Sequence, residues 1–135
     1  MKLIINTLAF LLFFSLSCES QEKKTDLSLT YIAQTRGFIY SLQLKDNKIE
    51  LNNNNSIKKL ELSETDIEQV TKILSEIDFE KIENNISVDD LAVDKAIQGN
   101  FDLVFKQKKH SFQFNHHNVP EKIKQLLTYI EEIKE

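Results

Sequence analysis

Hydrophobic and polar residues alternate along much of the chain, which predicts β-strands with one buried face. Successive side chains of a strand point to opposite faces, so an apolar residue at every second position lines one face. The longest alternating stretch puts Leu27, Leu29 and Tyr31 on one face. A tight turn at Asp46-Asn47 predicts a hairpin. The alternating segments are residues 27–34, 38–44, 49–51, 57–62, 101–105 and 112–114.

Two further segments have apolar residues at helical spacing and are predicted to be amphipathic helices. The first begins at Ser63, which can cap the helix while Asp66, at the third helical position, completes a capping box. The second opens at residues 118–121, where Asn118 is a good N-cap and Pro120 is tolerated in the first turn. The apolar stripes are Ile67, Val70, Ile73, Leu74 and Ile77 in the first helix and Ile123, Leu126, Leu127, Ile130 and Ile133 in the second.

The order of these segments predicts a single α+β domain over residues 27–135, preceded by a tether at residues 18–26. We expect an antiparallel sheet of about five strands with two amphipathic helices packed on one of its faces. The chain has 2 glycines and 1 proline, so its turns must be made mainly by Asn and Asp, which tolerate left-handed backbone. The run Asn52–Asn55 is predicted to be a loop, and residues 84–98 show no clear periodicity.

The first residues have the pattern of an export signal. Lys2 precedes an apolar run from Leu3 to Leu16, and Ser17 and Cys18 follow. The run is shorter than the roughly 20 apolar residues of a membrane-spanning helix and suits the apolar region of a signal peptide. Residues 1–17 are therefore predicted to be a lipoprotein signal peptide that is cleaved before Cys18.

Cys18 is the single cysteine of the chain, and two processing rules lead to it. A lipoprotein signal more often has Leu, Val or Ile three residues before the cysteine, where this chain has Ser15. Ser15 and Ser17 also fit an ordinary signal peptidase site, which would be cut at the same place. We favour lipidation of Cys18, because acylation removes the oxidation liability of a lone exported thiol. The predicted location is the cell envelope, with the domain outside the cytoplasm and anchored by lipid, at the outer membrane.

Charge and motif content argue against several kinds of partner and chemistry. The chain has 17 Lys and Arg against 21 Asp and Glu, and this acidic balance argues against nucleic acid, which clustered Lys and Arg bind. Nucleophile-elbow, phosphate-loop, dinucleotide and HExxH motifs are all missing from the sequence. We therefore expect no cofactor and no metal. The expected partners are the membrane, through the lipid, and a protein or small molecule.

His116 and His117 are the candidates for chemistry, at the junction of a strand and a helix. On a strand they would point to opposite faces, so they cannot easily ligate one metal unless the strand has ended by then. A zinc site would need a third ligand, for which Asp89, Asp90 and Asp94 are candidates. General acid–base chemistry by either histidine with Asp94 is another alternative. We favour a simpler interpretation, in which two polar residues close a strand and lead into a helix cap.

The segment Thr35-Arg36-Gly37 interrupts two predicted strands. Gly37 can supply a bulge or bend there, with Arg36 in solvent. Alternatively, Arg36 is held at a rim, where its guanidinium group could meet a carboxylate or a phosphate. We favour the bend.

Three short segments carry a resemblance to a known family. Thr35-Arg36-Gly37-Phe38 precedes an aromatic-rich strand, Asp94 begins a segment continued by Lys and Ala, and residues 114–120 read Phe-Asn-His-His-Asn-Val-Pro. In this order they resemble small uncharacterised lipoproteins common in Bacteroidota, which have Thr-Arg-Gly, Asp-Gly-Ala and Asp-His-Gly-Asn-Pro-Pro-like segments. This chain departs from that pattern at Lys95, Asn115 and His117. The resemblance implies no particular activity, and it implies that Arg36, Asp94 and His116 share a site.

Together these features predict a membrane-anchored lipoprotein of the cell envelope that acts as a binding or interaction module rather than as an enzyme. Two alternatives stay open. One is an immunity or inhibitor protein, which would bind its partner through an exposed loop such as residues 84–98. The other is a hydrolase that uses His116 and Asp94.

Overall fold

The computed structural model describes residues 26–87, 89, 91 and 96–134. These residues form one antiparallel sheet of six strands, in the order β4-β3-β2-β1-β5-β6, and two α-helices. The α+β prediction is confirmed, with six strands instead of about five. The predicted signal peptide, Cys18 and most of the tether lie outside the described residues.

The strands are β1 (Leu27–Thr35), β2 (Phe38–Lys45), β3 (Lys48–Asn53), β4 (Ser56–Glu61), β5 (Gln98–Phe105) and β6 (Lys108–Asn115). The helices are α2 (Glu64–Ser75) and α4 (Glu121–Glu132), with short 3₁₀ segments η1 (Phe79–Lys81) and η2 (His116–Asn118).

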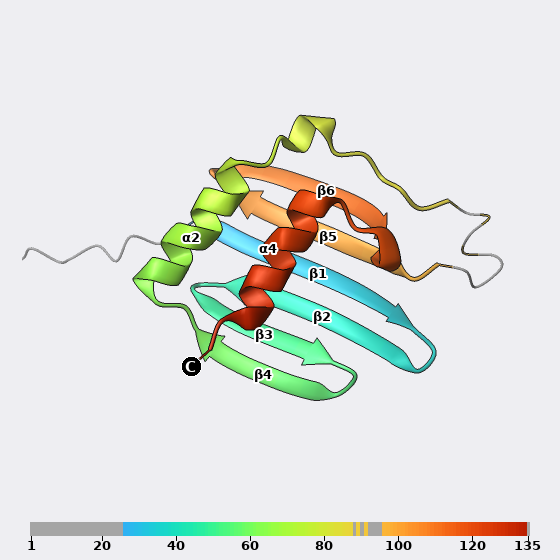
Figure 1. Ribbon diagram of the computed structural model, residues 1–135, viewed down its shortest axis with the longest axis horizontal. Coiled ribbons are helices and arrows are strands. Elements are labelled where there is room, and N and C mark those ends of the chain that lie inside the picture. The colour runs from blue at the N-terminus through green and yellow to red at the C-terminus, as the bar shows by residue number, and fades with distance from the viewer. Residues whose placement is uncertain (1–25, 88, 90, 92–95, 135) are drawn as a thin grey trace, which may run out of the picture.

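The alternating pattern decides which face of the sheet the helices cover. Along β1, Leu29 and Tyr31 are fully buried and alternate with half-exposed residues. The strand register puts Tyr31 beside Leu42 of β2 and Phe101 of β5, so that the buried positions line up across the sheet. Both α-helices lie over this one face (Figure 1), as predicted. Their fully buried residues are Val70 and Leu74 in α2 and Ile123, Leu126 and Ile130 in α4.

Asn and Asp supply left-handed backbone at two of the hairpin turns, as the low glycine content predicts. The φ angles are 49° and 62° at Asp46 and Asn47, and 49° and 70° at Asn54 and Asn55. Two consecutive positive φ angles match the twist of the flanking strands, as in a type I′ turn. Of the predicted loop Asn52–Asn55, the first two residues still pair with β2, so the turn is shorter than expected.

The turn between β5 and β6 uses residues that are poorly suited to it. Lys106 and Gln107 have φ angles of 50° and 64°, a region in which a side chain is strained. Replacing Gln107 by glycine is expected to raise the free energy of unfolding by about 0.5–1 kcal/mol, since relief of strain exceeds the entropy that glycine loses on folding. Urea unfolding measures the change. Asn55→Gly is the matched control and should gain less, because asparagine already tolerates this conformation; a destabilised Gln107→Gly protein would contradict the argument.

Of the two predicted N-terminal caps of the helices, one is confirmed and the other is wrong. At α2 the Asp66 N–H donates to Ser63 Oγ at 3.2 Å and the Ser63 N–H donates to Asp66 Oδ2 at 3.1 Å, so the predicted capping box is confirmed. The prediction of Asn118 as the cap of the last helix is wrong, because Pro120 occupies the N-cap position of α4 and makes no side-chain cap hydrogen bond. A residue before proline avoids helical backbone, and Val119 is extended with ψ of 136°. Asn118 therefore ends η2 instead of starting α4.

Candidate functional site

The end of β6 holds His116 at one end of the sheet. The chain leaves the strand after Asn115, whose side chain accepts a hydrogen bond of 3.0 Å from the His117 N–H. The His116 N–H donates to the carbonyl of Ile97 at 2.8 Å. The following turn is tied to the segment beside β6, because Asn85 Nδ2 donates to the carbonyl of Asn118 at 2.6 Å. The backbone on both sides of His116 is thereby fixed.

Three aromatic rings from β1 and β2 surround the imidazole of His116. Its ring centroid lies 5.2 Å from that of Phe38, 5.3 Å from that of Tyr40 and 5.8 Å from that of Tyr31. A hydrogen bond of 2.9 Å joins the Tyr31 hydroxyl oxygen and His116 Nδ1. Tyr31 is fully buried, and this bond gives its hydroxyl group the partner that a buried tyrosine requires. Burial raises the pKa of Tyr31 to about 12, so its hydroxyl group stays protonated at neutral pH.

Tyr40 connects this cluster to the last helix. Its hydroxyl group donates to Oε1 of Glu131, near the end of α4. Burial, and then the hydrogen bond to the carboxylate, raise the pKa of Tyr40 far above its usual range. The carboxylate of Glu131 is therefore held beside the aromatic rings, although the two residues are 91 positions apart in the sequence.

A cavity of about 470 Å³ opens beside these residues, a size that suits a small organic molecule. The rings of Tyr31, Phe38, Tyr40 and His116 form its aromatic wall. The polar and charged groups around it come from α4 and from the ends of β3 and η2: Asn53, His117, Asn118, Glu121, Lys124, Thr128 and Glu131. The cavity thus combines an aromatic wall, which can cover the apolar part of a ligand, with polar groups that can orient it.

His116 favours its neutral form in this setting. Burial, with a smaller contribution from His117, lowers the pKa of His116 below its ordinary value of 6.5. A neutral imidazole keeps one nitrogen as an acceptor and the other as a donor. Nδ1 is hydrogen-bonded to the Tyr31 hydroxyl group. The other ring nitrogen, Nε2, has no hydrogen bond to any described residue and is available to a ligand.

The lowered pKa of His116 predicts a pH dependence of stability. The unfolded chain takes up the proton at a higher pH than the folded one, so neutral His116 stabilises the fold above about pH 6.5. This contribution is lost as the pH falls through the lower pKa of the folded state. Urea unfolding at about pH 7 and about pH 5 should show the decline, and it should be smaller in His116→Gln. An equal decline in both proteins would contradict this role of His116.

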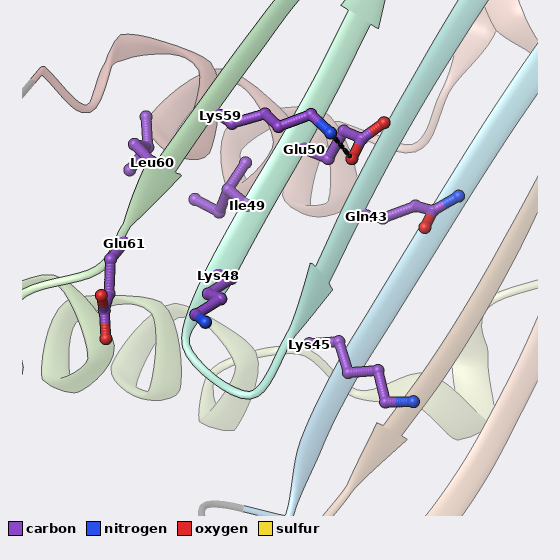
Figure 2. Close-up of a pocket in the computed structure, with 8 residues that line it drawn as sticks. All are labelled: Gln43, Lys45, Lys48, Ile49, Glu50, Lys59, Leu60 and Glu61. Carbon is purple, nitrogen blue, oxygen red and sulfur yellow. Dashed lines mark ion pairs between the residues drawn. The ribbon is translucent and has the colours of Figure 1, made fainter.

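A second hollow, of about 490 Å³, lies across β2, β3 and β4. Figure 2 shows its charged side chains on the sheet with the helices behind the strands. Its charges are partly paired, since Lys59 Nζ lies 2.9 Å from Glu50 Oε2 and both side chains are at least half exposed. Exposed ion pairs of this kind contribute little and are typical of a solvated sheet face. The His116 cavity is therefore the better candidate site.

The predicted site residues are only partly brought together. His116 lines the cavity, whereas Arg36 is exposed in the turn between β1 and β2 and is not part of the lining. Gly37 has a φ of 81° in that turn, which agrees with the favoured bend. Asp94 lies outside the described residues, so its distance from His116 is not part of the structure.

The strand has ended before His116, which was the condition for the two histidines to act together. Their ring centroids are 5.9 Å apart. Among the described residues, however, no group of three His, Cys, Asp or Glu side chains is arranged to hold a metal ion. Among the described residues, His116 Nδ1 is hydrogen-bonded to the phenol of Tyr31. The acid–base pair considered from the sequence would instead require a carboxylate, that of Asp94.

The sequence did not single out Tyr31, Tyr40 or Glu131. The two tyrosines occupy core positions of alternating strands, and their hydroxyl groups are the one signal that could have marked them, since a buried hydroxyl group needs a polar partner. Neither a protein-family model nor a curated protein matches this chain. In the described part of the chain, no helix has the length and apolar character required to cross a membrane.

Proposed function

We propose that this chain is a lipid-anchored protein of the bacterial cell envelope whose domain binds a small molecule in the His116 cavity. The observation that carries the binding function is the cavity itself, where three aromatic rings and a carboxylate surround a half-buried histidine. The sequence from Lys2 to Cys18 supports export and lipidation. A cavity whose polar groups are already positioned favours binding, because little side-chain freedom remains to be lost.

The cavity and the first residue of β1 lie at opposite ends of the sheet. Leu27, where β1 begins, pairs with the last residue of β5. Phe38 and His116 belong to the other end of the sheet, and Figure 1 shows η2 far from the start of β1. The chain that would carry the lipid therefore joins the sheet at the end opposite the cavity.

The binding function can be tested by NMR on the isotope-labelled full chain in a neutral detergent, with a library of small fragments. Fragments that bind are expected to shift the resonances of Phe38, Tyr40 and His116 more than those of the second hollow around Lys59. Phe38→Ala should reduce these shifts, and Phe105→Ala, at the opposite end of the sheet, is the control. Fragments that bind equally well to wild type and Phe38→Ala would refute the assignment of this site.

Lipidation can be tested separately in cells that express the full chain. Feeding an alkyne-tagged fatty acid should label the wild-type protein and not Cys18→Ser. The wild-type protein should also sediment with membranes, while the variant is released if the signal is still cleaved. An unlabelled wild-type protein would show that the chain is not lipidated, and it would leave the binding function untouched.

A further inference from the structure

The charges that line the His116 cavity are unbalanced. Glu121 and Glu131 each bring a carboxylate, and Lys124 brings one ammonium group. Neutral His116 adds no charge, so the lining has an excess of negative charge at neutral pH. Lys58 also approaches α4, but its ammonium group donates to backbone carbonyls at the end of that helix and is not part of the lining.

The carboxylate of Glu131 is oriented before any ligand arrives. The Tyr40 hydroxyl group donates to Oε1, and Oε2 has no hydrogen-bond or ion-pair partner among the described residues. Glu131 is exposed to solvent, but its carboxylate is held in one orientation beside the aromatic rings, so it attracts a positive group without losing side-chain freedom. Its negative charge repels an anionic group.

The aromatic wall adds a second attraction for positive charge. Phe38 is half-buried and lines the cavity, with its centroid 5.2 Å from that of His116. Tyr40 lines the same cavity, with its centroid 5.3 Å from that of the imidazole. The face of an aromatic ring carries partial negative charge and attracts cations, above all organic ammonium groups that have an apolar surface.

We propose that the His116 cavity binds an organic cation, whose ammonium group lies against Phe38 and Tyr40 and next to the Glu131 carboxylate. This inference rests on the proposed function, namely that the cavity binds a small molecule. An ammonium group with methyl substituents suits the site because it combines an apolar surface with a positive charge and sheds its hydration at low cost. Glu121 adds to the excess of negative charge around it.

The test compares three probes of nearly equal shape and different charge, on the full chain in a neutral detergent. Choline is the cation, dimethylbutanol replaces its nitrogen by carbon, and dimethylbutyrate carries a carboxylate. Calorimetric titration should give a dissociation constant for choline roughly tenfold lower than for dimethylbutanol. Dimethylbutyrate should bind more weakly than either.

Two variants separate the two attractions. Glu131→Gln keeps an acceptor for the Tyr40 hydroxyl group but loses the charge. It should therefore raise the dissociation constant of choline roughly fivefold and leave that of dimethylbutanol unchanged. Phe38→Leu keeps the apolar contact but loses the ring, with the same expected pattern. The controls are Glu132→Gln, at an exposed neighbour outside the cavity lining, and Phe105→Leu, at the other end of the sheet.

The outcomes distinguish this inference from the function on which it rests. Equal binding of choline and dimethylbutanol, or choline binding that survives both variants, would overturn the inference and keep the cavity as a binding site. If choline does not bind but library fragments still shift the resonances of Phe38 and His116, the inference is likewise overturned and the cavity remains a binding site. If neither choline nor any fragment binds, both proposals are overturned.

Discussion

Truncating Phe101 to alanine is expected to lower the free energy of unfolding by about 3–5 kcal/mol, a large part of the stability of a domain of this size. Phe101 is fully buried on β5, and its ring lies within 6.4 Å of the rings of Phe112 and Phe114 on the neighbouring strand. The alanine leaves a cavity that these neighbours can fill only in part. Urea unfolding followed by circular dichroism measures the loss.

Phe105→Ala is the matched control for this truncation. Phe105 lies on the same strand and the same face, four residues later, but at the end of β5 and only partly buried. The same chemical change should cost less than half as much there, because the site is already partly open to water. If the two truncations cost the same, the centre of the core does not lie at Phe101.

This difference between two phenylalanines marks how far the sequence predicts the fold. The apolar residues Phe101, Leu103 and Phe105 alternate with other residues in the sequence. This pattern predicted a strand with one buried face, which the structure confirms. Periodicity is a local property, and it does not state which strands lie side by side. β5 returns to pair with β1 across a long segment of the chain, and this pairing puts Phe101 in the centre. Burial along a strand therefore depends on contacts that the pattern of one segment does not contain.

The candidate site was less predictable for the same reason. His116 could be singled out because two adjacent histidines stand at the junction of a predicted strand and a predicted helix. Tyr40 and Glu131 were not, since one fits the core pattern of β2 and the other the exposed side of α4. They form a hydrogen bond only because α4 packs over the sheet. The sequence carries the pattern of each element, whereas the site arises where two elements meet.

Replacing Gly99 by alanine is expected to destabilise the protein by about 1–3 kcal/mol and to disturb His116 at the same time. Gly99 is buried on β5, and a Cβ atom built there would lie 2.7 Å from Cζ and 2.8 Å from Cε2 of Tyr31. Such distances are too short for carbon atoms, so the buried ring must move. Its hydroxyl group would then lose the position that holds His116 Nδ1 at 2.9 Å.

Two measurements follow the predicted effect in Gly99→Ala. Urea unfolding should show the loss of stability, and the NMR titration of His116 should move up toward its ordinary pKa of 6.5 as the displaced ring admits water. Gly37→Ala is the control, because nothing lies near its added Cβ and its cost comes from a φ of 81° alone. It should lower stability by about 1 kcal/mol without moving the titration.

A double-mutant cycle decides whether the contact with Tyr31 is the cause. Tyr31→Leu removes the far end of the ring, which is the part that the added methyl group would strike. The Gly99→Ala change should therefore cost much less in the Tyr31→Leu protein than in the wild type, and the interaction energy should be of the order of 1 kcal/mol or more. Additive costs would mean that Gly99 is required for its backbone alone. In that case the close packing of β5 against Tyr31 would not be what positions His116 at the cavity.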